Sequence, residues 1–273
     1  MSARVGDGLG PALGRLRPVL AAVAVIVGVF LLLPLIAILP SSLTAGEFLV
    51  FPPQGLSARW YASVAGDPGW RDALLRSVEL SLAGAALAVG AGTMAALGLN
   101  RLRRGSRVVR ASLLVPLVVP GIVYALGLYS LLARVGLDRS EWGVIAGQAT
   151  LALPVVVIVV SAALAAIDPA VPLAARSLGA RTPRIIWTVE LPLARRGMLA
   201  AFVMAFTLCF DEVIVALFLS PPSSDTVPTH LFSQSQDNLG PDLAAVGILV
   251  VVSALVLLGT AALLLRPGRR MAA

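Results

Sequence analysis

The chain has 273 residues, of which 58% are hydrophobic and only 13% charged, against about 25% charged in an ordinary soluble domain. This much apolar surface is more than one globular core of this size buries, so the composition favours a membrane protein. The net charge of +7 comes with arginine as the only basic residue besides one histidine. These arginines gather between apolar runs, so we expect membrane orientation and no nucleic-acid partner.

Six apolar runs of about 20 residues predict six transmembrane helices, and hence an all-α, polytopic membrane protein with a single domain over residues 1–273. In chain order, the predicted spans are 18–40, 73–99, 111–133, 143–166, 198–219 and 243–265. The first run could also belong to a signal peptide, since Arg15 and Arg17 precede it. It is longer than the roughly 7–15 apolar residues of such a peptide, and no A-x-A cleavage site follows, so we interpret it as an anchor.

The arginines predict the orientation of these spans. Sixteen of the 21 arginines lie in the four segments on one side of the predicted membrane, which are 1–17, 100–110, 167–197 and 266–273. Positively charged residues stay in the cytoplasm, so both termini are predicted to be cytoplasmic. The loop 220–242 on the opposite side has no arginine and carries three aspartates.

Prolines interrupt two of the predicted spans: Pro116 and Pro120 lie in the third, and Pro154 lies in the fourth. This pattern is common in membrane helices and is compatible with a packed bundle.

The cytoplasmic loop 168–197 contains the sequence LAARSLGARTPRIIWTVELP at 173–192, with three arginines between two apolar spans. Thr182 followed by Pro183 predicts a helix start, and Gly179 suits the end of a preceding helical turn. We therefore expect two short helices joined at Gly179. The spacing of apolar residues in this loop is also compatible with an alternative, in which the two helices lie on the lipid surface without a protein partner.

The spacing of this loop resembles the signature of the permease subunits of bacterial ABC importers, E-A-A, three residues, G, nine residues, I, one residue, L-P. Leu173 stands where the family has glutamate, and Val189 replaces isoleucine. The resemblance extends over about residues 57–265 and is closest in kind to spermidine/putrescine-type permeases. The matching positions are Leu173, Ala174, Ala175, Gly179, Val189, Leu191 and Pro192.

The resemblance implies a type I importer fold in the bacterial cytoplasmic (inner) membrane, surrounded by lipid. It implies that 168–197 is a coupling loop that docks on a separate ATP-binding subunit, and that Leu173 removes one polar contact there. It further implies a second permease subunit, forming a heterodimer, and a periplasmic or lipid-anchored substrate-binding protein. The outer loop 220–242, with a predicted short helix at about 228–236, is expected to meet that binding protein.

The chain has no residue set for ATP hydrolysis or other catalysis. A P-loop requires a lysine, and the sequence has none, so ATP must be bound by a partner subunit and no cofactor is expected here. His230 is the only histidine and lies in the outer loop, without a second imidazole or thiolate cluster for a metal. We expect no enzyme activity and no metal site.

Four ionisable residues fall inside predicted spans, where charges are costly and usually face a bundle interior, a cavity or a partner. Arg76 and Glu79 are three residues apart, so we expect a structural ion pair. Asp211 and Glu212 have no basic residue in their span, so they either make tertiary contacts or line a translocation path for a cation such as a polyamine. Two alternatives remain: a proton- or ion-coupled secondary transporter using these acids, and a membrane scaffold.

Overall fold

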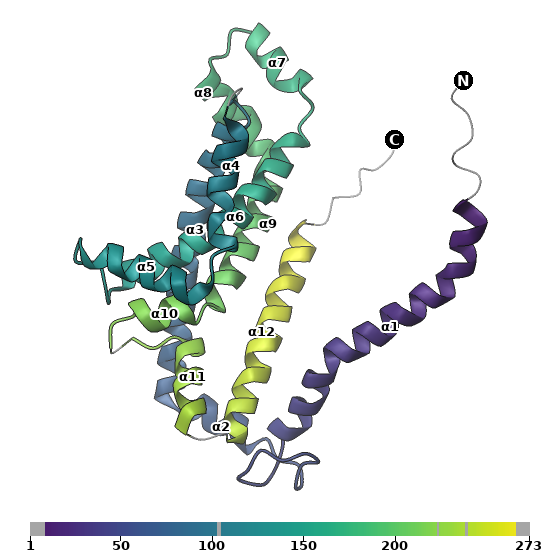
Figure 1. The fold of residues 1–273 in the computed structure, drawn as a ribbon, viewed down its shortest axis with the longest axis vertical. Helices are drawn as coiled ribbons and strands as arrows, with labels where there is room; N and C mark the ends of the chain where they lie inside the picture. The colour runs from purple at the N-terminus through teal and green to yellow at the C-terminus, as the bar shows by residue number, and fades with distance from the viewer. Residues whose placement is uncertain (1–8, 103–104, 223, 238–239, 266–273) are drawn as a thin grey trace. The chain divides into compact units, whose positions relative to one another are not determined.

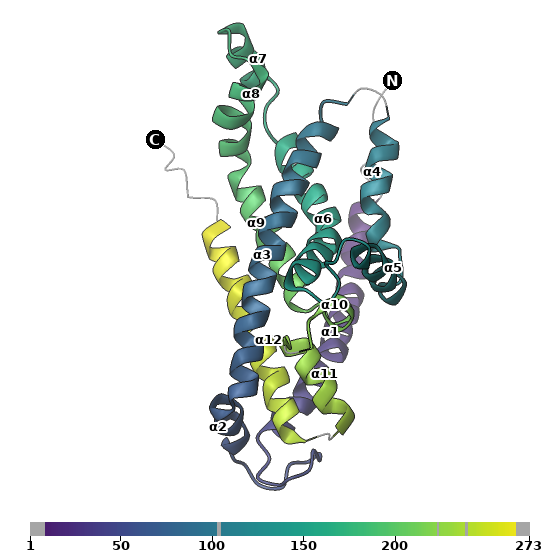
Figure 2. The same ribbon diagram turned by 90° about the vertical axis from the view of Figure 1, so that its left-hand side faces the viewer.

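The computed structural model describes residues 9–102, 105–222, 224–237 and 240–265, and the described chain is helical, with one isolated β-bridge (Figures 1 and 2). The predicted all-α fold is confirmed. The chain divides into two compact units, one of residues 1–64 with 239–249 and the other of 65–238 with 250–273. Each unit is described by itself below.

The first unit contains the long apolar helix α1 (Leu9–Ser42), followed by a loop that ends at α2 (Arg59–Gly66). Side chains tie α2 to the end of α1 and to the loop: Ser42 Oγ at the end of α1 lies 2.7 Å from Tyr61 Oη, and Trp60 Nε1 donates to the carbonyl of Thr44 in the loop at 3.1 Å. Large apolar side chains along α1 are exposed, including Phe30 at 72%. Exposed apolar side chains on a helix this long are compatible with lipid as the surrounding solvent.

Three helices form the core of the second unit: α3 (Pro68–Leu99), α6 (Glu141–Ala165) and α9 (Leu191–Phe210), which run side by side in Figure 1. Small residues line their contact, because only small side chains allow helix backbones to approach closely. Gly92 packs against Val156, and Gly197 against Ala163. The buried alanines of this core are Ala85, Ala88, Ala96, Ala149, Ala152, Ala194, Ala201 and Ala205.

The third predicted span, 111–133, is not one straight helix. It consists of α4 (Ser106–Leu114), the short 3₁₀ helix η1 (Val115–Leu117) and α5 (Gly121–Ala133), with a bend of 103° between the two halves. Pro120 immediately precedes α5 in an extended conformation, because a proline lacks the N–H that a continuing helix needs. In Figure 1, α5 therefore crosses the direction of α3 and α6.

Two shorter helices complete the second unit after α9. α10 (Ile214–Leu219) packs on α5 and α6, where Val144, Val215 and Leu219 are fully buried. α11 (Val227–Asp237) packs on the first part of α3. The Val227 N–H donates to Ser77 Oγ at 2.7 Å, which joins the two helices.

The helices agree closely with three of the predicted spans, 18–40, 73–99 and 143–166, and the total of six stays a prediction. Four described helical stretches are long and apolar enough to cross a membrane: Pro18–Ser42, Pro68–Leu99, Glu141–Ala165 and Thr182–Phe210. The bent pair of α4 and α5 makes a fifth if its two halves form one broken span. The last helix is α12 (Pro241–Leu265). Its stretch Pro241–Val256 is apolar but has fewer than the 18 residues that a membrane-spanning helix needs. The predicted fifth span, 198–219, is interrupted: α9 ends at Phe210, and the chain is not helical again until Ile214.

Candidate functional site

The loop between α6 and α9 folds into two short helices, as the sequence predicts. α7 (Ala170–Ser177) carries Leu173, Ala174 and Ala175, and α8 (Thr182–Ile185) follows after the turn at Gly179. Both helices lie at one end of the α3–α6–α9 bundle (Figure 1). α7 packs against α8 and against the next turn of chain, so the loop is a folded unit.

Gly179 is the residue that turns the chain between these helices. Its φ of +82° lies in the left-handed region, where glycine has no steric penalty and other L-residues do. The N–H of Gly179 donates to the Arg176 carbonyl at 2.9 Å, and that of Ala180 to the Ala175 carbonyl at 3.1 Å. These bonds satisfy the last carbonyls of α7, as is usual at a glycine-terminated helix end.

A π-helical turn, η2 (Ile186–Glu190), follows α8 and contains Val189; Leu191 and Pro192 then open α9. The sequence did not predict this turn, since its apolar residues also fit an ordinary helix. Wide turns of this kind often occur at functional sites. Trp187 in this turn is 73% exposed, and Leu178 beside Gly179 is 89% exposed. The loop therefore presents large apolar side chains among arginines.

Glu190 joins the loop to the end of α3. Its Oε2 lies 2.7 Å from Arg101 Nη2, and Arg101 also donates to the Leu97 carbonyl. The Glu190 side chain is 18% exposed. A recess of about 420 Å³ lies beside this pair and is lined in part by Leu173 and Arg176. The sequence analysis did not predict this ion pair. The feature of the sequence that could have indicated it is that Glu190 is the only carboxylate in 173–192.

Asp211 and Glu212 have different environments, although they are adjacent. Glu212 Oε1 accepts hydrogen bonds from the backbone N–H groups of Ile214 and Val215, at 2.8 and 3.0 Å, and so caps α10. Asp211 ends α9 and is exposed, and no hydrogen bond or ion pair joins its carboxylate to another described residue. The expectation of one continuous helix through both acids is wrong, because the Glu212 side chain itself starts a new helix.

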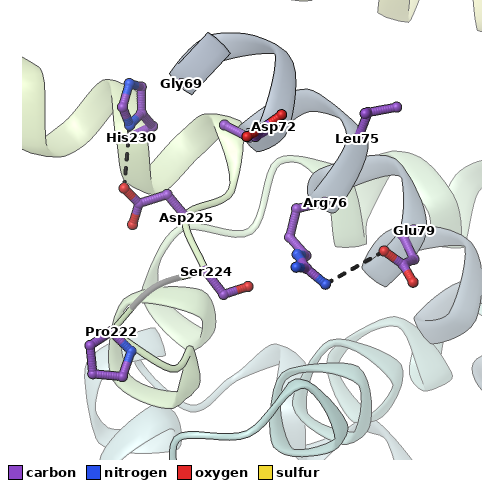
Figure 3. Close-up of a pocket in the computed structure, with 10 residues that line it drawn as sticks. Gly69, Asp72, Leu75, Arg76, Glu79, Pro222, Ser224, Asp225 and His230 are labelled. Atoms are coloured by element: carbon purple, nitrogen blue, oxygen red, sulfur yellow. Dashed lines mark hydrogen bonds and ion pairs between the residues drawn. The ribbon is translucent and has the colours of Figure 1, made fainter.

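Arg76 and Glu79 lie on the same face of α3, with Nη1 of Arg76 3.6 Å from Oε2 of Glu79 (Figure 3). Arg76 also donates to Glu141 Oε1 in the first turn of α6. Sequence reasoning did not identify Glu141, which is 65 residues from Arg76. The arginine therefore links α3 to α6 at the end of the bundle away from α7 and α8.

Residues 88–270 match the family described as "Binding-protein-dependent transport system inner membrane component". The match covers 183 of the 273 residues. The chain belongs to this family. It is thus a permease component of an ABC importer and a multi-pass bacterial inner-membrane protein. The matched segment contains the loop 168–197, Asp211 and Glu212, whereas Arg76 and Glu79 precede it.

Several named permeases are similar to this permease component. The putrescine transport system permease protein PotI of Escherichia coli is 30% identical over 234 residues, which cover 81% of this chain and 82% of the relative. The spermidine/putrescine transport system permease protein PotC of the same organism is 29% identical over 238 residues, covering 87% and 90%. The molybdenum transport system permease protein ModB of Mycobacterium bovis is 32% identical over 211 residues, covering 71% and 80%.

Solved structures of ABC transporters share the fold of this permease component. A bacterial alginate ABC transporter, in complex with a periplasmic protein bound to alginate pentasaccharide, matches with a TM-score of 0.70 and 18% identity over 95% of this chain and 98% of that one. The MetNI methionine ABC transporter matches with a TM-score of 0.61 and 17% identity over 73% and 98%. At these identities the likeness concerns the fold alone.

Proposed function

We propose that this permease component forms half of the solute pathway of an ATP-driven importer, that it couples to a separate ATPase subunit through the loop 168–197, and that the solute is a polyamine or a similar small cation. The observation that carries the coupling role is the folded loop itself. It is a compact unit that exposes Leu173, Leu178 and Trp187, and exposed apolar side chains of this size favour a protein partner.

The polyamine assignment is supported by relatives and by charge. Two relatives that cover at least 80% of this chain are named for putrescine or spermidine/putrescine transport. Asp211 is an exposed carboxylate at the end of α9, without a described partner, and a carboxylate near a pathway attracts amines electrostatically. The relative named for molybdenum transport covers less of the chain, 71%, than the two named for polyamines.

The partners follow from the same reasoning. The coupling loop needs an ATPase subunit in the cytoplasm, because the chain has no lysine for a P-loop. The arginine distribution supports cytoplasmic termini and a 220–242 loop on the outer side of the membrane. A second, different permease subunit completes the pathway, and an external substrate-binding protein delivers the solute to the outer face.

Purification from the native membrane tests the class of transporter. We expect a tagged chain, solubilised gently, to bring down an ATP-binding subunit and a second permease. Reconstituted with them and the binding protein in liposomes, it should take up labelled putrescine only when ATP is supplied. Deletion of 176–188 should abolish the uptake while the chain still inserts. ATP-driven uptake by this deletion variant would contradict the coupling role.

A secondary transporter that uses Asp211 and Glu212 is the second candidate function. The contacts of Glu212 disfavour it, since its Oε1 already accepts two backbone N–H hydrogen bonds at the start of α10 and so has a structural role. The same liposomes separate the two functions. Uptake by the chain alone, driven by an imposed proton gradient without ATP, would support the secondary transporter and overturn the importer.

A further inference from the structure

A pocket of about 440 Å³ lies at the end of the second unit away from α7 and α8, between the start of α3 and the described residues Pro222, Ser224, Asp225 and His230 (Figure 3). On the α3 side it is lined by Asp72, Arg76 and Glu79, and on the other by Ser224, Asp225 and His230. With the proposed orientation, this pocket opens to the outside of the cell. It does not include Asp211 or Glu212.

The two walls of the pocket are held against each other by specific contacts. The Val227 N–H donates to Ser77 Oγ at 2.7 Å. The rings of Trp70 and His230 meet edge to face, with their centroids 4.5 Å apart. Trp70 is only 5% exposed, so this contact is part of the packed interior. The pocket is thus preformed rather than assembled by a ligand.

The charges of the pocket favour a cation. Three carboxylates line the pocket, those of Asp72, Glu79 and Asp225, and they outnumber the one lining arginine, Arg76. Arg76 contacts Glu79 and Glu141, and Asp225 lies 3.3 Å from Nδ1 of His230. The acids do not converge on one point: within the described residues, no group of three or more histidine, cysteine or acidic side chains suits a metal ion. Asp72 and Glu79 are seven residues apart on α3, which is about 10 Å of helix rise.

Ser224 supplies an independent sign that a ligand belongs here. The residue is 4% exposed, and its hydroxyl has no hydrogen-bond partner among the described residues. Figure 3 shows this hydroxyl directed across the pocket, toward Arg76 and away from the Asp225 carboxylate. A buried hydroxyl without a partner is costly, and its oxygen is free to accept a hydrogen bond from an N–H donor.

We propose that this pocket binds a protonated aliphatic diamine or polyamine, with one ammonium group at Asp225 and another between the Ser224 hydroxyl and the acids of α3. Separated acids fit an extended cation with separated charges better than a compact metal ion. The inference rests on the proposed function for the class of solute, and it adds an outer binding site distinct from Asp211. Because the carboxylates are largely exposed, added salt should weaken the binding.

Equilibrium dialysis of labelled 1,4-diaminobutane against the full chain in lipid nanodiscs tests the site without ATP. We expect Asp225→Asn to raise the Kd of the diamine about tenfold, because one charged hydrogen bond to the ligand is lost. Ser224→Ala should raise the Kd several-fold. n-Butylamine, which has one ammonium group, should bind at least about tenfold more weakly than the diamine.

Two matched controls should leave the Kd unchanged. Ser81→Ala removes another buried hydroxyl without a described partner, on α3 but outside the pocket. Asp138→Asn removes a carboxylate from the loop before α6, also outside the pocket. Ser224→Ala removes no described side-chain bond, so it should fold normally, and thermal unfolding checks this.

Equal binding by wild type, Ser224→Ala and Asp225→Asn would overturn the site, as would equal affinity for butylamine and the diamine. ATP-driven putrescine uptake by the assembled transporter is a separate readout. If uptake requires ATP but the pocket variants bind normally, the outer site is wrong and the importer stands. If uptake is independent of ATP, the importer is wrong whatever the pocket binds.

Discussion

Arg101 and Glu190 form an ion pair, with 2.7 Å between Nη2 and Oε2, that joins the end of α3 to the π-helical turn in front of α9. The two residues are 89 positions apart in the chain. The pair is the described ionic link between the coupling loop and the bundle. It is partly exposed, so its contribution to global stability should be small. The ion pair matters because it fixes the position of the coupling loop against the end of α3.

Arg101→Gln and Glu190→Gln should each reduce ATP-driven uptake by about threefold or more, since residues that connect two sites typically change coupling by about 0.5–2 kcal/mol. The free energy of unfolding should change by less than about 1 kcal/mol. Uptake in liposomes and thermal unfolding measure the two effects.

The double variant with the charges exchanged, Arg101→Glu with Glu190→Arg, should recover uptake. Arg134→Gln, which changes an exposed arginine outside the coupling loop with no described ion pair, is the control, and an equal loss in that variant would remove any special role for Arg101.

Gly179→Ala should weaken coupling, and Gly179→Leu should abolish it. A side chain at φ +82° costs about 1 kcal/mol or more, which favours another path for the chain between α7 and α8. The chain should still reach the membrane fraction, while ATP hydrolysis no longer drives uptake. Gly98→Ala is the matched control, because a Cβ there meets nothing within 4 Å and its φ is ordinary. Normal coupling in Gly179→Leu would mean that the turn is only a connector.

Gly92→Ala should destabilise the bundle by about 1–3 kcal/mol, the usual cost of overpacking. A Cβ at this position would lie 2.6 Å from Val156 Cγ1 and force α3 away from α6. The midpoint of thermal unfolding in detergent measures the effect. Val156→Ala in the same chain should restore part of the loss by removing that methyl group. Gly90→Ala, where a Cβ meets nothing within 4 Å, should leave the midpoint unchanged or raise it slightly, because alanine favours the helix more than glycine. A similar loss there would show that the contact with Val156 is not the cause.

Substitutions of Asp211 and Glu212 should separate transport from stability. Glu212→Ala removes the cap of α10 and should cost about 1 kcal/mol of stability, whereas Glu212→Gln keeps an oxygen acceptor and should cost less. Asp211→Asn should reduce the uptake of putrescine without a change in the unfolding midpoint. Unchanged kinetics in Asp211→Asn would leave Asp211 without a role in the pathway.

The sequence predicted the long helices well, because each is a continuous apolar run. The predicted spans 73–99 and 143–166 lie within a few residues of α3 and α6. The two short helices of the coupling loop were also predictable, since Pro183 and Gly179 are local signals for a helix start and a helix end. In each of these cases the information lies within a few neighbouring residues.

Features that depend on distant contacts were not predictable in this way. The run 198–219 is apolar on both sides of Asp211, so composition gave no reason for α9 to end at Phe210. The end depends on the Glu212 cap and on the burial of Val215 and Leu219 against α5 and α6. Likewise, Arg76 was assigned to Glu79 by its spacing, and only the fold brings Glu141 within reach. Single-sequence patterns report local periodicity, not partners 65 residues away.

The close packing of α9 on α3 and α6 has a mechanical consequence. Gly197 meets Ala163, and eight buried alanines line the contact beside Val156, Val160 and Leu164. The helix backbones are therefore close together, and few side chains there have rotamers that could absorb sliding. The three helices should therefore move as one stiff body. α9 has 20 residues and is about 30 Å long, so it acts as a lever arm from the coupling loop to Asp211. A tilt of about 10° at the loop would displace the far end by about 5 Å.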